Sequence, residues 1–161
     1  MLDLLIRIIN FIKYLEIVHR NECPCIKIAK SALVMDKTSI NCLKTGIIEI
    51  GEDTFINEMC SIIAYDAAIK IGNGVFVGPE TVMHTYGHKF QRTDLPIRKQ
   101  GGTVKSIIIE DDVWIAAHCT ILGGVRIGTH SVIGAHSLVN KSIPPYSVAY
   151  GVPCKVRRTR D

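Results

Sequence analysis

Aliphatic residues recur at every sixth position between residues 109 and 144. The hexads begin with Ile109, Ile115, Ile121, Ile127, Ile133 and Val139. A helix repeats every 3.6 residues and an alternating strand every two, so neither explains a strict period of six. A fixed short period indicates a repeat architecture, and six is the period of a parallel β-helix. The repeat therefore predicts an all-β prism of triangular coils, in which each hexad forms one short strand and a corner.

The same period continues towards the N-terminus. The earlier runs are Ile50, Ile56 and Ile62, then Ile71, Val77 and Met83, and a weaker one at Ile28, Val34 and Ile40. The phase breaks at 44–49 and at 67–70, where we expect bulged corners to absorb the additional residues. Residues 28–161 are therefore expected to form one β-helix domain. Each aliphatic side chain buried inside it contributes about 1.5–3 kcal/mol.

Residues 1–27 lie outside the repeat and are expected to form a separate N-terminal segment. Within 1–20, polar residues are spaced three or four apart, which predicts a short amphipathic α-helix, and residues 21–27 form a connector. The charges argue against a membrane span, and the segment lacks the pattern of a signal peptide. We expect this helix to pack against the β-helix or a neighbouring subunit. The alternative is peripheral contact with a membrane surface through Arg7, Lys13 and Arg20.

The stretch 84–106 interrupts the repeat with a long loop. It contains His84 and His88, basic residues on both sides of Pro96, and a Gly101-Gly102 pair. A long excursion from a regular solenoid is usually functional, and histidine is the natural general base near neutral pH. The loop is therefore a candidate part of an active site. No role is assigned to His84.

Trp114 precedes a hexad start, so its side chain is predicted to point outward and to cover a subunit, a loop or a ligand. Asn57 and Asp66 are polar residues in otherwise apolar hexads, where they either close corner turns or serve a site. Pro144-Pro145 predict the end of the repeat. The basic C-terminal tail, 155–161, is either a solvated end or a phosphate contact.

Composition narrows the function classes. The net charge of +4 is modest, and no nucleic-acid-binding signature is present, so no nucleic-acid partner is expected. Cys60 and Cys119 occupy small-residue slots of the hexads, which suits free cysteine. Cys23 and Cys25 have no second pair at zinc-finger spacing, so no metal site is expected. We interpret the cysteines as reduced and the location as cytoplasmic.

Several motifs together resemble the hexapeptide-repeat acyltransferases, and among them the sugar O-acetyltransferases related to galactoside and maltose acetyltransferase. The resemblance covers roughly residues 50–158. It rests on Gly78-Pro79, the spacing from Pro79 to His88, Asp111–Ile115, Ile133–Ala135, Lys141–Pro145 and Gly151–Pro153. The loop residues Gly87–Phe90, with Arg92 and Pro96–Arg98, are most similar to members that act in surface-polysaccharide biosynthesis. Residues 1–27 lie outside the resemblance.

The resemblance implies a left-handed parallel β-helix that assembles as a homotrimer, with active sites between subunits and acetyl-CoA as the acyl donor. It implies no required metal. It also implies His88 as the general base that removes a proton from a saccharide hydroxyl during direct attack on the thioester. The acceptor would lie against Asn57, Asp66 and Trp114. The positions that correspond to acetyl-CoA contacts are Ala117, Ala135, Asn140, Lys141, Lys155 and Arg158.

The chain departs from the galactoside acetyltransferases at Lys89, Ala117 and Asn140, where they have proline, serine and threonine. A nucleotide-sugar N-acyltransferase, with the same prism and donor but an amine acceptor, is the nearest alternative function. A γ-type carbonic anhydrase would need two zinc-binding histidines five residues apart, and no pair among the loop and repeat histidines has that spacing. A non-catalytic β-helix scaffold is the remaining alternative.

Overall fold

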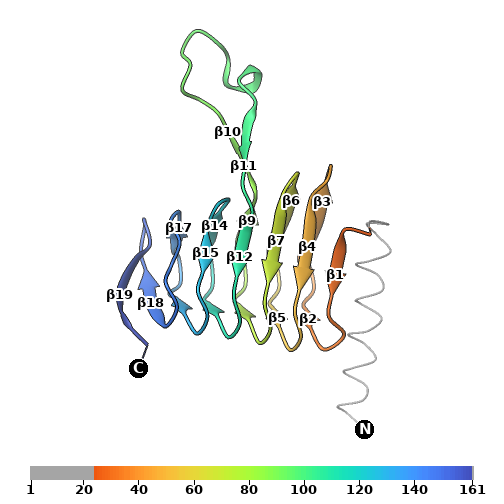
Figure 1. The fold of residues 1–161 in the computed structure, drawn as a ribbon, viewed down its shortest axis with the longest axis vertical. Coiled ribbons are helices and arrows are strands. Elements are labelled where there is room, and N and C mark those ends of the chain that lie inside the picture. Colours follow the sequence, from red (N-terminus) through yellow and green to blue (C-terminus); the bar gives the residue numbers. More distant parts are fainter. Residues whose placement is uncertain (1–23, 161) are drawn as a thin grey trace.

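The structure of the chain is a computed structural model that describes residues 24–160. The amphipathic helix expected within residues 1–20 lies outside the described residues. Short parallel strands build three sheets, which form the three faces of a prism (Figure 1). Within the described part of the chain, no helix is long and apolar enough to cross a bilayer.

Each sheet takes one strand from each of the first five coils, and sheet B is extended by β18 and β19. Sheet A contains β1 (Ile26–Ile28), β4 (Ile47–Ile50), β7 (Ala68–Ile71), β12 (Ile107–Ile109) and β15 (Arg126–Ile127). Sheet B contains β2 (Leu33–Val34), β5 (Phe55–Ile56), β8 (Phe76–Val77), β13 (Trp114–Ile115), β16 (Val132–Ile133), β18 (Ser147–Tyr150) and β19 (Lys155–Thr159). Sheet C contains β3 (Ser39–Leu43), β6 (Ser61–Tyr65), β9 (Val82–His84), β14 (Thr120–Leu122) and β17 (Leu138–Val139).

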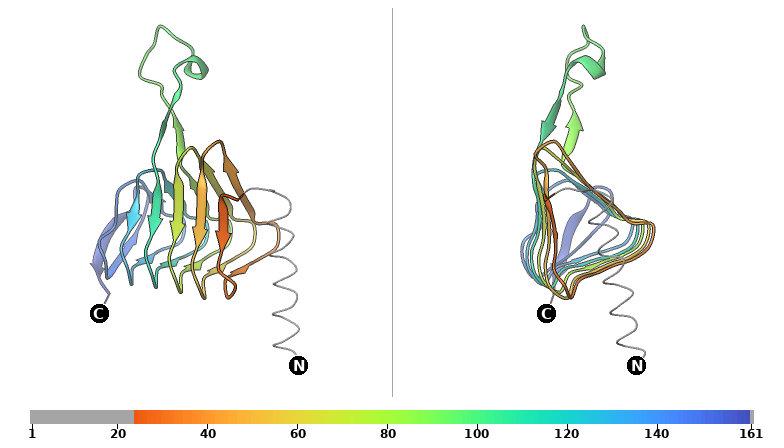
Figure 2. Two further views of the ribbon diagram at one scale, coloured as in Figure 1. Left: turned by 45° about the vertical axis from the view of Figure 1, so that its right-hand side comes forward. Right: turned by 90° about the vertical axis from the view of Figure 1, so that its right-hand side faces the viewer.

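The coils run in the order A, B, C, and this order sets the hand of the helix. Seen from the β1 end, the chain turns counter-clockwise as it recedes from the viewer (Figure 2, right). The β-helix is therefore left-handed, opposite to the hand of most parallel crossover connections. The left-handed fold implied by the resemblance is confirmed.

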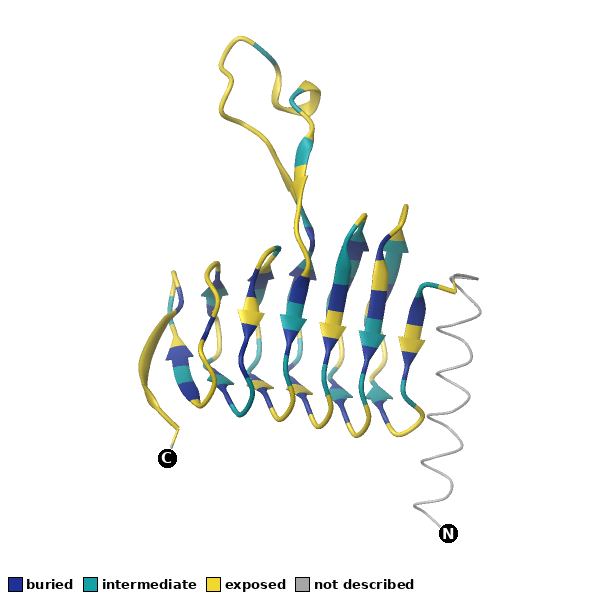
Figure 3. Ribbon diagram, in the orientation of Figure 1, coloured by how far each residue is buried: buried dark blue, intermediate teal, exposed yellow. Residues whose placement is uncertain are grey.

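The aliphatic hexad positions form the core, as predicted. Register pairing stacks Ile71 on Ile109 and Ile109 on Ile127 in sheet A, and equivalent columns run through sheets B and C. All the hexad starts from Ile109 to Val139 are at most 1% exposed, and the blue inward positions in Figure 3 trace these columns. Close packing of like residues in successive coils accounts for the strict period.

From the second coil onwards, the corner between sheets A and B carries one residue with positive φ in each coil. These residues are Asp53, Gly74, Asp112, His130 and Tyr146. Successive members are joined through the backbone, since the amides of Asp112 and His130 donate to Asn73 and Asp111 carbonyls in the preceding coil. Only glycine, and to a smaller extent Asn, Asp and His, adopts this conformation readily, which explains the polar and small residues at this corner.

The phase breaks are absorbed by longer strands just before them, rather than by the bulged corners that were expected. Strands β3 and β6 are longer than other strands of sheet C and pair along their whole length, from Ser39–Ser61 to Leu43–Tyr65. The expected end of the repeat at Pro144-Pro145 is wrong. Sheet B continues past the prolines, because β18 still pairs in parallel with β16 before the chain reverses.

The basic segment beginning at Lys155 is exposed along β19, as expected of a solvated end, and it also pairs antiparallel with β18, which the sequence did not predict. One further expectation needs correction. Cys25 is disulfide-bonded, which overturns its interpretation as a reduced cysteine. It precedes β1 rather than occupying an inward slot of a hexad, whereas Cys42, Cys60, Cys119 and Cys154 lie in the coils and are free.

Truncation of a stacked isoleucine tests the role of the core columns. Ile115 is fully buried between Val77 and Ile133, so Ile115→Ala should lower the free energy of unfolding by about 2–5 kcal/mol in denaturant titrations. Ile47→Ala is the matched control, because this isoleucine is 42% exposed, and its cost should stay near 0.5 kcal/mol. Equal losses for the two variants would contradict this account of the core.

Candidate active site

The loop that interrupts the repeat forms a β-hairpin. Strands β10 (Tyr86–His88) and β11 (Gly102–Val104) pair antiparallel, with His88 opposite Gly102. The hairpin leaves the prism between β9 of sheet C and β12 of sheet A, so it stands on the corner between those two sheets (Figure 2). His88 is exposed near the middle of this hairpin.

Internal hydrogen bonds organise the tip of the hairpin. It contains a short 3₁₀ helix, η1 (Ile97–Lys99). The Gln100 side chain donates to the carbonyls of Arg92 and Leu95 at 2.7 and 2.9 Å and accepts from the Arg92 amide at 3.0 Å. Arg92 also forms an ion pair with Asp94. The tip is thus a braced structure, which suits a segment that must hold a functional side chain in place.

The base of the hairpin is fixed to sheet C by Thr85. Its buried hydroxyl donates to the Tyr65 carbonyl at 3.0 Å and accepts from the Tyr65 amide at 2.8 Å. Tyr86 then packs its ring against Tyr65, with ring centroids 4.9 Å apart, and meets the His88 ring edge-on at the same distance. A chain of contacts therefore connects the last residue of β6 to His88.

Asp66 follows Tyr65 directly, so it lies at the same corner of the prism as the hairpin. Its carboxylate accepts a hydrogen bond from the Thr45 hydroxyl and lies 3.8 Å from the Lys44 ammonium. These contacts, the Thr45 hydrogen bond first, hold the pKa of Asp66 below its usual range. Lys44 also covers the Tyr65 ring, 4.7 Å from its centroid. An ionised, exposed carboxylate and an exposed imidazole thus share this corner.

His84 lies below the hairpin, on the outer face of sheet C. Its Nε2 is 3.0 Å from the Ser61 hydroxyl, and partial burial lowers the pKa of its imidazole. A cavity of about 310 Å³ lies beside it. Tyr86, Thr103 and Lys105 also line this cavity.

Trp114 points outward from sheet B, as predicted, and is 51% exposed. It stands in register between Phe76 and Val132, so apolar side chains run across the outer face of this sheet. A cavity of about 530 Å³ lies over this part of sheet B, and Phe76, Trp114 and Arg158 all line it. Aromatic and cationic side chains thus face the same space.

The remaining sequence-predicted positions fall into two groups. Asn57, Ala117 and Ala135 lie where sheet B turns into sheet C, and the Asn57 side chain accepts from the Glu58 amide at 2.8 Å in a corner turn. Lys155 and Arg158 lie on β19 at the end of sheet B. Asn140 and Lys141 follow β17, so they share the corner between sheets C and A with Asp66 and His88.

One copy of the chain does not bring all these residues together. His88 and Asp66 lie at the corner between sheets C and A, and sheet B, which carries Trp114 and Arg158, is the opposite face of the prism (Figures 1 and 2). Any site that uses both His88 and Trp114 therefore needs a second copy of the chain.

Sequence reasoning missed the residues that hold His88 in place. Tyr86 lies two positions before His88, so a period of two along the hairpin strand would have placed both rings on one face. Thr85, Tyr65 and Lys44 carry no comparable signal, because their contacts depend on the pairing of distant strands. Among residues 24–160, no three His, Cys, Asp or Glu side chains are arranged to hold a metal ion.

Comparison with known proteins identifies the family. Residues 106–141 match the bacterial transferase hexapeptide family of six repeats. Galactoside O-acetyltransferase of Lactococcus lactis is 45% identical over 94 residues, which are 58% of this chain and 44% of that protein. The galactoside O-acetyltransferase of Escherichia coli is 40% identical over 112 residues, which are 69% of this chain and 53% of that protein.

A solved structure extends the match over most of the prism. A hexapeptide-repeat acetyltransferase from Vibrio cholerae, complexed with acetyl coenzyme A, is 32% identical and has a TM-score of 0.67. The match covers 81% of this chain and 72% of that one. The chain therefore belongs to the hexapeptide-repeat acetyltransferases. It spans about half of the length of the curated relatives it matches.

The packing of Tyr86 against Gly102 gives a direct test of the hairpin geometry. A Cβ at Gly102 would lie 2.3 Å from the Tyr86 ring, so Gly102→Ala should displace that ring and shift the NMR signals of the His88 imidazole. Gly87→Ala is the matched control, because its Cβ would approach no atom closer than 3.6 Å. Unchanged His88 signals in Gly102→Ala would contradict the ring contact.

The lowered pKa of His84 predicts a pH effect on stability. Between its folded pKa and the ordinary value near 6.5, the unfolded chain binds the proton that folded His84 does not, so stability falls as the pH falls through this window. His84→Gln should lose less stability than the wild type between pH 7.5 and pH 5 in denaturant titrations. An equal loss of stability in both proteins would show that His84 does not contribute to the pH dependence of stability.

Proposed function

We propose that the chain is an acetyl-CoA-dependent O-acetyltransferase that acts on a saccharide hydroxyl, in surface-polysaccharide biosynthesis. The observation that carries the proposal is the placement of His88. It is an exposed imidazole on a braced hairpin, at the same corner of the prism as the ionised carboxylate of Asp66. Membership of the acetyltransferase family and the acetyl coenzyme A in the Vibrio cholerae relative support the choice of donor.

In the proposed reaction, His88 accepts the proton of the attacking hydroxyl as that oxygen adds to the thioester carbonyl. An alcohol is a weak nucleophile at neutral pH, and a positioned base typically contributes a factor of about 10²–10⁴. Tyr86 restricts the orientation of the imidazole through its edge-on contact. The protonated imidazole then returns the proton to the leaving thiolate. Asp66, and Asn57 from a neighbouring corner, accept hydrogen bonds from other hydroxyls of the saccharide.

We further propose that the active sites lie between subunits of a homotrimer. His88 and Trp114 occupy opposite sides of one prism, whereas cyclic assembly brings the corner of one subunit to sheet B of the next. In such a trimer the outer face of sheet B would be covered by a neighbouring subunit, and the outer face of sheet A would stay in solvent. Sheet A carries the ion pairs Lys70–Glu49 and Arg126–Glu110, which suit solvent, and sheet B carries Phe76 and Trp114.

Acetyl-CoA would extend along the groove between subunits. The proposed contacts place Trp114 beside the reacting end and Ala117 and Ala135 beside the pantetheine arm. The nucleotide end would meet Asn140 and Lys141 at one corner, and Lys155 and Arg158 on β19. The four thiols of the coils are free, which suits a reducing compartment, whereas Cys25 is disulfide-bonded. On the coil thiols we propose a cytoplasmic location. Membrane contact through residues 1–20 is a hypothesis about the segment outside the described residues.

Replacement of the proposed base tests the mechanism. His88→Ala should lower kcat about 10²- to 10⁴-fold, while the affinity for acetyl-CoA stays near the wild-type value, because the imidazole acts on the acceptor. Turnover is measured as thiol release across a panel of saccharides and amino sugars. Unchanged turnover in His88→Ala would rule out the general base, and a strict preference for amines would favour N-acylation.

Mixing two inactive variants tests the composite site. His88→Ala and Trp114→Ala each damage every site of their own trimer. Random co-assembly should restore roughly a quarter of the wild-type activity, because one in four interfaces then pairs an intact His88 with an intact Trp114. No recovery in verified mixed trimers would contradict sites formed between subunits.

A further inference from the structure

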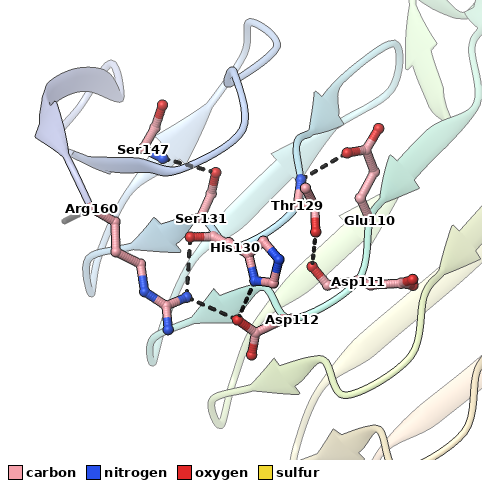
Figure 4. Close-up of polar contacts among 8 residues, drawn as sticks. All are labelled: Glu110, Asp111, Asp112, Thr129, His130, Ser131, Ser147 and Arg160. Carbon is pink, nitrogen blue, oxygen red and sulfur yellow. Dashed lines mark hydrogen bonds and ion pairs between the residues drawn. The ribbon is translucent and has the colours of Figure 1, made fainter.

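The end of β19 is held to the prism by a polar network that the proposed reaction does not use. One guanidinium nitrogen of Arg160 donates to Asp112 Oδ2 and to the His130 carbonyl, both at 3.1 Å (Figure 4). The same Asp112 oxygen lies 2.6 Å from His130 Nδ1. Asp112, His130 and Arg160, here called the corner network, thus join the end of β19 to the corners of two earlier coils.

Neighbouring contacts support the same corner. The His130 ring stacks on Tyr146, with centroids 4.9 Å apart, and the Arg160 amide donates to the Tyr146 carbonyl at 2.7 Å. The hydrogen bond from His130, followed by the charge of Arg160, lowers the pKa of Asp112. The carboxylate is therefore ionised and paired at neutral pH.

The network lies beside the cavity over Trp114. Asp112, Arg158 and Arg160 all line that cavity. Arg160 is engaged by Asp112, whereas no carboxylate among residues 24–160 pairs with Arg158, whose guanidinium donates to the Thr159 carbonyl at 3.0 Å. Arg158 is thus the cation left available to an anionic ligand in this space.

We propose that Asp112 is a positioning residue that holds β19 through Arg160, so that Arg158 faces the β19 end of the Trp114 cavity, where the phosphates of the acyl donor bind, while the thioester lies towards Trp114. This inference rests on the proposed function for the identity of the ligand. Asp112 and Arg160 are half exposed, with side chains 52% and 42% accessible, and such ion pairs contribute little to stability. The corner network is therefore expected to fix the position of β19 while adding little to the stability of the fold.

The variant Asp112→Gly removes the carboxylate without straining the corner. Asp112 has a φ of 50°, and the chain already has glycine at the equivalent position in the preceding coil, where Gly74 has a φ of 61°. Asp53→Gly is the matched control, since Asp53 occupies the same corner with a φ of 54° and lies four coils before Tyr146. Trp114 is the only tryptophan, so its fluorescence reports binding in this cavity.

Asp112→Gly should weaken CoA binding roughly 5- to 10-fold and leave pantetheine binding within about twofold, because pantetheine lacks the phosphates. The direction of this change distinguishes positioning from charge. If Asp112 acted only through its charge, its removal from an anion site would strengthen CoA binding. Arg160→Gln should weaken CoA binding equally, and the double variant no further. The amides of β19 should exchange hydrogen faster in Asp112→Gly than in the wild type or in Asp53→Gly.

The outcomes separate this inference from the proposed function. Unchanged exchange in β19, or CoA binding that is unchanged or tighter in Asp112→Gly, would overturn the positioning role. Failure of the wild type to bind CoA would instead overturn the proposed donor. Hydrogen exchange, which needs no ligand, would still decide whether Asp112 holds β19.

Discussion

Stacking of like aliphatic residues across successive coils is the interaction on which the rest of the structure depends. Ile71, Ile109 and Ile127 in one sheet, and their counterparts in the other two, exclude water along the whole axis of the prism. Because each coil must repeat the dimensions of the one beneath it, corners recur at fixed positions. The packing of the core therefore determines where the corner residues lie, although these residues are outside the core.

This constraint explains why the candidate functional residues gather at corners and on one face. The core cannot accept a long insertion within a strand, so the hairpin that carries His88 leaves at the corner between sheets C and A. Asp66 reaches the same corner because the longer strand β6 ends there. Sheet B carries outward aromatic side chains instead, and its separation from the hairpin means that a site using both His88 and Trp114 would need a neighbouring subunit.

The fold could be predicted from the sequence because its determinant is local and periodic. Ile109 to Val139 specify the coils, and the position of Trp114 just before Ile115 specifies its outward direction. The link from Asp66 through Tyr65 and Tyr86 to His88 could not be predicted, because it depends on which strands become neighbours. The pairing of β19 with β18 was missed for a different reason: the basic residues suggested a solvated end, whereas the edge of sheet B was open to a further strand.

The proposed function requires that this prism bind acetyl-CoA at sites formed between its subunits. Calorimetric titration of the purified protein with acetyl-CoA and with CoA tests it most directly, because no acceptor needs to be known. We expect saturable binding of about one molecule of acetyl-CoA per chain, measured on protein that elutes as a trimer. No binding at millimolar concentrations of acetyl-CoA would contradict the assignment of donor and site.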